Sequence, residues 1–129
     1  MQFRYVVILI FFIFGNCLTA KEYQGQVIFY SYVEQSTSNQ DQVEVDSDFS
    51  YHVGGILEFL DKKNIKHQII YKSDFTIITI NGQKLRIRKK QIPTSAGYIM
   101  IKNNGKYLIS NGIGTDADMI SEIYEYFGI

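Results

Sequence analysis

The chain opens with an uninterrupted run of apolar and aromatic residues. Arg4 is followed by ten such residues at positions 5–14 (YVVILIFFIF). A membrane-spanning helix needs about 20 apolar residues, so this shorter run is typical of a cleavable signal peptide. We expect cleavage after Ala20, with residues 1–20 as the signal peptide and residues 21–129 as one small domain. The protein is then secreted or periplasmic and has no transmembrane span.

The residues after position 20 predict a strand, a polar loop and a helix. Residues 24–33 are rich in β-branched and aromatic residues on both alternating faces, which indicates an interior strand covered on both sides. Residues 34–47 are polar and lack helical periodicity, so we expect a long loop there. Asp48 can cap the helix that follows. The apolar positions of that helix have the spacing of one buried stripe: Val53, Ile56, Leu57 and Leu60.

Two adjacent glycines lie within this helical stripe. Gly54 and Gly55 together cost about 2 kcal/mol of helix propensity relative to alanine. Either the helix begins near Gly55, or a neighbouring backbone packs closely against it.

The next part of the chain predicts one strand and two hairpins. Each hairpin is centred on an Asn-Gly pair, Asn81-Gly82 or Asn104-Gly105, which is typical of a two-residue turn. The second turn would place Leu108 on the same face as Ile99 and Ile101. The five predicted strands of this region are residues 66–72, 75–80, 83–88, 98–102 and 106–110.

A second helix follows Thr115, whose hydroxyl can cap it with Asp118 as the reciprocal partner. Its apolar stripe consists of Met119, Ile120, Ile123, Tyr124 and Phe127. The order of elements is therefore β-α-β-β-β-β-β-α, with short links between the later strands. This order predicts an α+β fold with a mainly antiparallel sheet of about six strands and two helices.

Charge is segregated along the chain although the formal net charge is zero. Acidic residues dominate positions 21–61 and 107–129, whereas positions 62–106 hold 11 Lys and Arg residues against Asp74 alone. A near-neutral total argues against bulk affinity for nucleic acid, while the segregation allows a local basic surface.

The clearest basic feature is the segment Lys84–Lys90, which alternates basic and apolar residues as far as Arg88 and continues with two lysines. A two-residue turn would place Ile77 opposite Arg86 and Phe75 opposite Arg88, so that basic and apolar side chains share one face. Such a face suits an acidic protein surface or a polyanion. The alternative is a solvated sheet face or a charged edge that prevents aggregation. The candidate binding residues are Phe75, Ile77, Lys84, Arg86, Arg88 and Lys90.

Cysteine and histidine usage indicates no metal and no cofactor. Cys17 is the single cysteine and leaves with the signal peptide, unless it becomes the lipid-modified first residue of a lipoprotein. Without it the exported chain has no disulfide, no cysteine nucleophile and no iron–sulfur cluster. His52 and His67 are 15 residues apart and lack the spacing of a zinc site.

Catalytic motifs are weak. A Ser/His pair drawn from Ser31, Ser50, His52 and His67 has no nucleophile-elbow motif around it. The glycine-rich segment 111–116 precedes a helix, but it lacks the Lys-Ser/Thr of a phosphate-binding loop and is interpreted as a capping loop. Asp116 and Asp118 offer a calcium alternative without a complete EF-hand spacing.

One segment resembles a known fold. Ile92-Pro93-Thr94, a hairpin turning at Asn-Gly and Gly114 before an amphipathic helix resemble the C-terminal half of the thioredoxin-like fold, over about the last 37 residues. The chain departs from that pattern at Ser95–Gly97, which separates Pro93-Thr94 from the strand, in the extra hairpin at Asn81-Gly82, and in having no C-x-x-C motif. The resemblance implies a thioredoxin-like α/β fold as the alternative architecture, without redox chemistry.

These features together favour an exported non-enzymatic domain that binds another protein, such as a periplasmic inhibitor or a toxin-immunity protein. The alternatives are a small envelope hydrolase, a redox-inactive thioredoxin-like protein and a polyanion-binding module. The sequence leaves the identity of the partner and the oligomeric state open.

Overall fold

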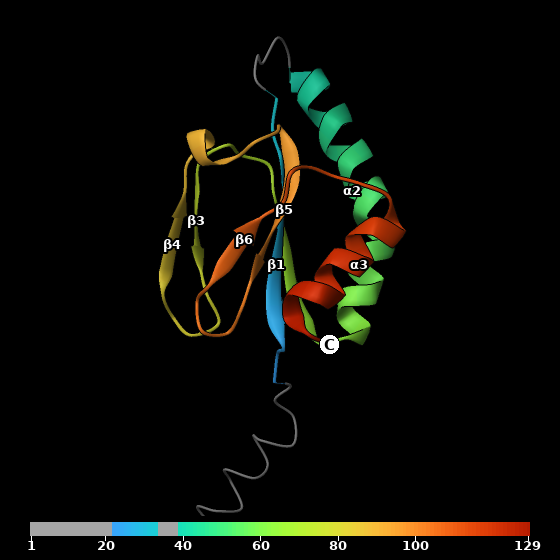
Figure 1. Ribbon diagram of the computed structural model, residues 1–129. Helices are drawn as coiled ribbons and strands as arrows, with labels where there is room; N and C mark the ends of the chain where they lie inside the picture. The colour runs from blue at the N-terminus through green and yellow to red at the C-terminus, as the bar shows by residue number, and fades with distance from the viewer. Residues whose placement is uncertain (1–21, 34–38) are drawn as a thin grey trace, which may run out of the picture.

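The centre of the fold is a four-stranded sheet in the order β2 (Ile65–Ile70), β1 (Gly25–Ser31), β5 (Ala96–Ile101) and β6 (Tyr107–Ile109) (Figure 1). The computed structural model describes residues 22–33 and 39–129, with side chains from residue 49 onward in the first helix. Strand β1 runs parallel to β2 and antiparallel to β5, which is antiparallel to β6.

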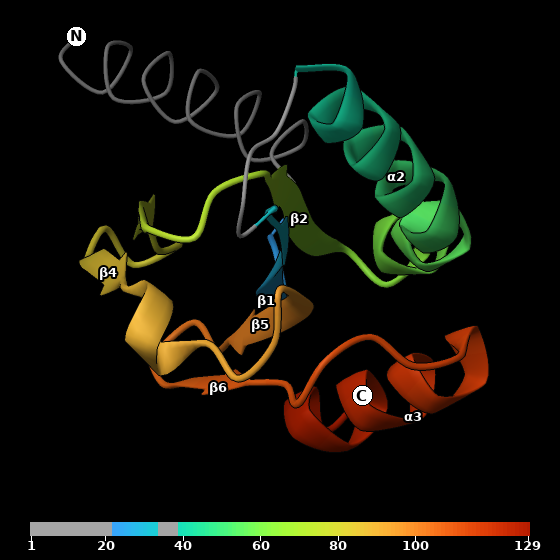
Figure 2. The same cartoon turned by 90° about the horizontal axis from the view of Figure 1, so that it is seen from above.

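This sheet is covered on both faces. Helices α2 (Asn39–Lys62) and α3 (Asp116–Phe127) pack on one face, and the hairpin of β3 (Phe75–Ile78) and β4 (Lys84–Ile87) lies on the other (Figure 2). The predicted α+β class and the order of elements are confirmed. The six strands divide into a sheet of four and a separate pair, β3 and β4, because the first hairpin packs on the sheet and does not extend it.

Strand β1 joins the two hydrophobic layers. Val27 and Phe29 belong to the core between the sheet and the helices, whereas Ile28 and Tyr30 belong to the core between the sheet and the hairpin. All seven residues of β1 are buried. Successive side chains of a strand point to opposite faces, so the run Val27–Tyr30, which is apolar or aromatic at every position, fits the two-sided burial that it predicts.

Helix α2 is longer than the sequence predicted. It begins at Asn39, so the loop expected over residues 34–47 is wrong for positions 39–47, and positions 34–38 lie outside the described residues. Adding turns to an existing helix costs far less than nucleating one, so a polar segment can continue a helix whose later turns are buried. Those later turns are anchored by Phe49, Val53, Ile56 and Leu60.

The two glycines of α2 do not mark its start. The helix runs through both, and a Cβ on Gly55 would lie 3.0 Å from a carboxylate oxygen of Asp116 on α3. The close neighbour expected at this point is therefore a side chain and not a backbone. A Cβ on Gly54 would meet nothing within 4 Å.

Both hairpins have a register shifted by one residue from the predicted one. Thr76 pairs with Arg86 and Ile77 with Leu85, because the backbone of Thr79 pairs with that of Gln83 around a three-residue loop. A positive φ occurs at Gly82 but not at Asn81, whereas the expected two-residue turn requires it at both positions.

The second hairpin repeats this geometry. Lys102 pairs with Lys106 around a three-residue loop, so Leu108 lies opposite Met100 and not on the face of Ile99 and Ile101. The positive φ is at Gly105. A one-residue shift moves each side chain of the second strand to the other face, which is why the predicted partners are wrong in both hairpins.

The C-terminal segment has the hairpin-then-helix order that the thioredoxin-like resemblance implies. Strands β5 and β6 are followed by α3, whose N-cap is Thr115. The Thr115 hydroxyl accepts a hydrogen bond from the Asp118 N–H at 3.2 Å, as the sequence predicted. The segment 111–116 is thus accounted for as a capping loop.

Candidate binding surface

The structure separates the apolar from the basic members of the predicted site. Phe75 and Ile77 are only 6% and 3% exposed and belong to the core beneath the hairpin. Lys84 and Arg86 are exposed on the opposite, outer face of the hairpin. The predicted face that combines them does not form, because it depended on the register of a two-residue turn.

Arg86 has partners within the hairpin. Its guanidinium donates hydrogen bonds to the carboxylate of Asp74 at 2.9 Å and to the hydroxyl of Thr76 at 3.2 Å. The Arg86 and Asp74 side chains are both about half exposed, so this ion pair contributes little to stability. It does offset part of the positive charge on the outer face.

A short 3₁₀ helix, η1 (Lys89–Gln91), carries the basic segment to another part of the surface. The Arg88 N–H donates to the Gln91 side chain at 2.8 Å, and the Ile92 N–H donates to the Lys89 carbonyl at 3.1 Å. Buried Ile92 anchors the end of this turn. Lys89 and Lys90 are both exposed and belong to this turn and not to β4.

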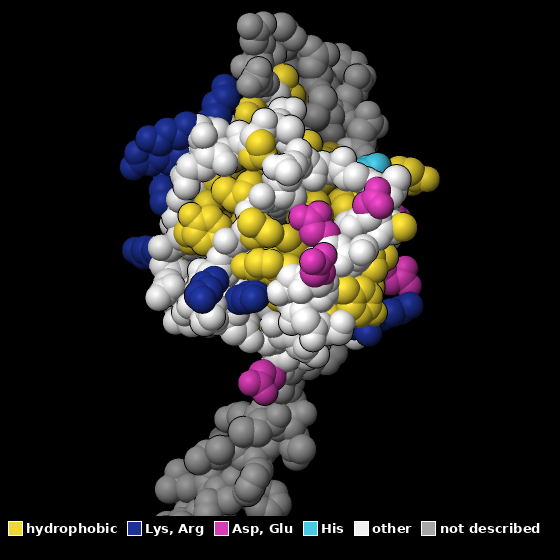
Figure 3. Space-filling model, viewed as in Figure 1, with side chains coloured by type: hydrophobic (Ala, Val, Ile, Leu, Met, Phe, Trp, Pro, Cys, Tyr) yellow, Lys and Arg dark blue, Asp and Glu magenta, His cyan; other side chains and the backbone are white. Residues whose placement is uncertain are grey.

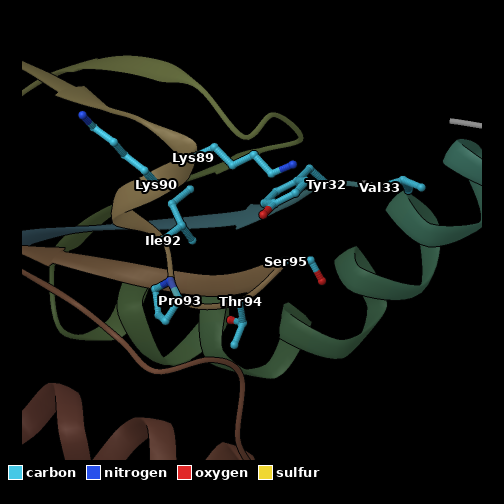
Figure 4. A pocket seen from close by; sticks show the side chains of 8 residues that line it. All are labelled: Tyr32, Val33, Lys89, Lys90, Ile92, Pro93, Thr94 and Ser95. Carbon is cyan, nitrogen blue, oxygen red and sulfur yellow. The ribbon is translucent and has the colours of Figure 1, made fainter. Parts of the chain in front are cut away.

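Lys89 and Lys90 border an open groove of about 1020 Å³, which we call the lysine groove (Figure 4). The Lys89 ammonium lies 5.6 Å from the centre of the Tyr32 ring, within the range of a cation–π contact. The groove lies between the C-terminal end of β1 and the segment that connects η1 to β5. It is lined by Tyr32, Val33, Lys89, Lys90, Ile92, Pro93, Thr94 and Ser95.

A second hollow, of about 460 Å³, adjoins the lysine groove and shares Tyr32 and Ser95 with it. We call it the Phe49 hollow. Phe49 is 7% exposed, and its ring meets that of Tyr71 edge-on, with 6.5 Å between the ring centres. The lining residues are Ser31, Tyr32, Phe49, His52, Ser95, Ala96 and Ile113.

Hydrogen bonds hold the wall between the two hollows. The Tyr32 N–H donates to the Ser95 carbonyl at 3.0 Å, which extends the β1–β5 pairing to the rim. The Thr94 hydroxyl donates to the Ala96 carbonyl at 2.6 Å and closes the turn before β5. The two shared residues therefore belong to a fixed part of the backbone.

The Tyr30 hydroxyl is buried at the β1–β5 contact. A Cβ on Gly97 would lie 2.5 Å from its oxygen, so Gly97 makes room for it. Within the described residues this oxygen has no partner in hydrogen-bonding geometry. Burial raises the pKa of Tyr30 to about 12, and the nearby Thr94 hydroxyl acts in the opposite direction. The hydroxyl is therefore neutral at physiological pH.

The histidines do not form a metal site in the described part of the chain. His67 lies 2.7 Å from the Asp61 carboxylate, whereas His52 lines the Phe49 hollow. No group of three or more His, Cys, Asp or Glu side chains that could hold a metal ion occurs among residues 22–33 and 49–129.

Charge is also divided over the surface. Figure 3 shows many Lys and Arg side chains on the hairpin side of the molecule, whereas Asp and Glu lie mainly over the helical side together with a smaller group of Lys or Arg. The segregation of charge along the sequence therefore persists only in part on this face. Sequence reasoning missed Tyr32, Lys89 and Ser95, because only the fold brings these three residues together at the lysine groove. The one local signal of a surface segment at this groove was Pro93, which follows the basic residues.

Comparisons of the chain with models of protein families, with curated proteins and with solved structures find no match. In the parts of the chain that the structure describes, no helix combines the length and the apolar character needed to cross a membrane.

Proposed function

We propose that this protein is an exported domain that binds another protein, and that its basic side recognises an acidic surface of the partner. The observation that carries the proposal is the lysine groove at the rim of the sheet, which Lys89 and Lys90 line and where the Lys89 ammonium lies over the Tyr32 ring. Tyrosine is enriched at surfaces that bind proteins. Positive charge beside it steers association with an acidic partner. A periplasmic inhibitor or a toxin-immunity protein would have this kind of surface.

A hydrolase is the second candidate, because His52, Ser31 and Ser95 line one hollow. Nucleophilic catalysis by serine needs a hydrogen bond from its hydroxyl to the base. In the described part of the chain no bond joins His52 to either serine. The geometry therefore favours binding over hydrolysis.

Site-specific photo-crosslinking tests the proposal. A benzophenone amino acid at Pro93, an exposed residue of the lysine groove, is expected to link the exported protein to one envelope or extracellular protein. The same probe at Asn103, exposed in the β5–β6 loop, serves as the matched control. Raising the salt concentration should slow association, because steering by surface charge is screened. A crosslink pattern that is the same at both positions would contradict the proposal.

A further inference from the structure

We infer that the outer edge of β6 pairs with β6 of a second copy of this chain, in antiparallel orientation, so that two four-stranded sheets join into one. The edge itself sets the kind of partner, because a row of unpaired backbone groups is satisfied by another strand. This surface shares no residue with the lysine groove, so the inference goes beyond the proposed function and does not depend on it.

Strand β6 lies at the margin of the sheet and has β5 as its one neighbour in the described part of the chain. Figure 2 shows this margin with α3 on one side and the β3–β4 hairpin on the other. Figure 3, viewed from this side, shows hydrophobic side chains between basic and acidic ones. On β6 itself, Tyr107 is 39% exposed and Leu108 is 47% exposed. An exposed apolar edge strand is where pairing between chains occurs.

The hydrogen bonds to β5 determine which backbone groups of β6 are left over. The Lys106 carbonyl and the Ser110 N–H bond to β5 at 2.8 and 2.9 Å. Bonded positions alternate along an antiparallel pair, so Leu108 also bonds to β5, whereas the N–H and C=O groups of Tyr107 and Ile109 point away from it. Among the described residues, no hydrogen bond satisfies these outward groups.

The outward groups fit a second copy related by a two-fold axis. When Tyr107 pairs with Ile109 of the second copy, and Ile109 with its Tyr107, every outward N–H meets an outward C=O. Leu108 then lies opposite Leu108 of the second copy, with about 4.5–5.5 Å between the Cβ atoms. Any other antiparallel register leaves Tyr107 or Ile109 without such a partner on β6. An interface of this kind is self-complementary, because each contact occurs twice.

Charge favours the same orientation. Helix α3 contains four acidic residues and no Lys or Arg, and its Glu122 lines a hollow beside Leu108. Lys106 is exposed and lies on the same face of the strand as Leu108, because the two are two positions apart. In the two-fold register Lys106 of each copy lies opposite Ser110 of the other, on the face that carries α3 of that copy. Parallel pairing would instead bring the two lysines together, which is unfavourable.

Sedimentation equilibrium of the exported protein tests for the dimer. The average mass should rise from that of one chain toward that of two between micromolar and millimolar concentration, because interfaces that bury less than about 1,200 Å² are weak. Leu108→Asp should weaken association at least about tenfold, since it removes a leucine from the axis and opposes two carboxylates. Ile78→Asp is the matched control at a side chain that is 55% exposed on the hairpin, and it should leave association unchanged.

Single cysteines test the register, in a Cys17→Ser background so that the introduced thiol is the only one. Leu108→Cys should form a disulfide between copies under mild oxidation, because the facing Cβ atoms lie within disulfide range. Tyr107→Cys should stay reduced, because its facing residue in the second copy is Ile109.

Amide hydrogen exchange measures the new backbone bonds directly. The N–H groups of Tyr107 and Ile109 should exchange more slowly as the protein concentration rises. The Leu108 N–H, which bonds to β5 in one copy alone, should exchange slowly at every concentration.

Three results would overturn the inference. A mass that stays that of one chain up to millimolar concentration excludes the second copy as the occupant of this edge. Association that Leu108→Asp leaves unchanged places the contact between copies elsewhere. Equal disulfide formation at positions 107 and 108 excludes the two-fold register. None of these results bears on the lysine groove, which the crosslink at Pro93 tests separately.

Discussion

Tyr98 on β5 donates a hydrogen bond from its hydroxyl to the carboxylate of Glu122 on α3, with 2.6 Å between the two oxygens. Tyr98 is 1% exposed, so this bond ties the last helix to the interior of the sheet. We expect Tyr98→Phe to lower the free energy of unfolding by about 1–2 kcal/mol, because a bond to a charged acceptor is lost. Urea denaturation near pH 7 measures this loss. Glu122→Gln, which keeps an acceptor, should cost less, and an equal cost would contradict the role of charge.

The buried tyrosines predict a loss of stability in alkali. Burial, and then the bond to Glu122, raise the pKa of Tyr98, and burial raises that of Tyr30 to about 12. Above the ordinary tyrosine pKa of about 10 the unfolded chain loses protons that the folded chain keeps, so the unfolding free energy falls as pH rises. Each of the two tyrosines should lower the free energy of unfolding by up to about 1.4 kcal/mol per pH unit between its pKa in the unfolded chain and its pKa in the folded chain.

Urea denaturation between pH 9 and 11.5 measures this slope. Tyr98→Phe should make it shallower, whereas Tyr51→Phe, at a side chain that is 91% exposed, should leave it unchanged. The three proteins differ only at these two tyrosines, so the comparison isolates the contribution of Tyr98. Identical slopes would show that Tyr98 ionises as readily in the folded state as in the unfolded one.

Replacing a glycine by alanine should raise the stability of the fold at one position and lower it at two others. Gly54→Ala should raise stability by about 0.5–1 kcal/mol, because the new methyl group enters open space on a helix. Gly97→Ala should lower it by about 1–3 kcal/mol, because the methyl group would lie 2.5 Å from the Tyr30 oxygen. Gly25→Ala should also destabilise, since its methyl group would overlap the Phe127 ring.

Thermal or urea unfolding compares these variants. Adding Tyr30→Phe to Gly97→Ala should recover part of the loss, because it removes the atom that the methyl group meets. Additive effects of the two substitutions would contradict the proposed close approach.

The register of the first hairpin can be tested with engineered disulfides. Thr76 and Arg86 are a directly opposed pair on the exposed face, and the Arg86 guanidinium reaches the Thr76 hydroxyl at 3.2 Å. Thr76→Cys with Arg86→Cys should therefore oxidise readily, because the two Cβ atoms of a facing pair lie within disulfide range. Ile77→Cys with Arg86→Cys, the pair that a two-residue turn would oppose, should remain reduced. Mass spectrometry after mild oxidation distinguishes the two outcomes.

The sequence predicted the order of the helices and strands, but neither the start of α2 nor the register of the two hairpins. The apolar run Val27–Tyr30 of β1 and the apolar stripes of both helices could be predicted, because the residues of each element themselves show which faces are buried. The register of β3 and β4 was not, because Asn81-Gly82 is compatible with a two-residue and a three-residue loop, and only packing of Phe75 and Ile77 beneath the hairpin selects between them.

The candidate site was less readable than the fold. Lys90 was identified, but Lys89, Tyr32 and Ser95 are brought together by the end of the β1–β5 pairing and by η1. No local pattern relates a tyrosine at the end of the first strand to a turn nearly sixty positions later. The polar start of α2 was missed for a similar reason, since its neighbours later in the helix provide the burial.

Export and cleavage after Ala20 both stay predictions, because residues 1–21 lie outside the described residues. We expect the exported protein to begin at Lys21, since the apolar run is too short to span and Ala20 precedes a charged pair. Intact mass and N-terminal sequencing of the secreted form measure this. A diacylglyceryl-modified Cys17 at the new terminus would instead indicate a lipoprotein.

The central position of β1 makes the domain indivisible. Its neighbours in the sheet are β2 and β5. Gly25 can therefore pair only after Ile65 is available, and Gln26 only after Ile101 is available. A nascent chain that lacks β5 has one bare edge on its most apolar strand, and a chain that lacks β1 has nothing to join β2 to β5. Such long-range pairing is slow to form. A chain that becomes available from its N-terminus therefore cannot complete this sheet until residues 96–101 are also available.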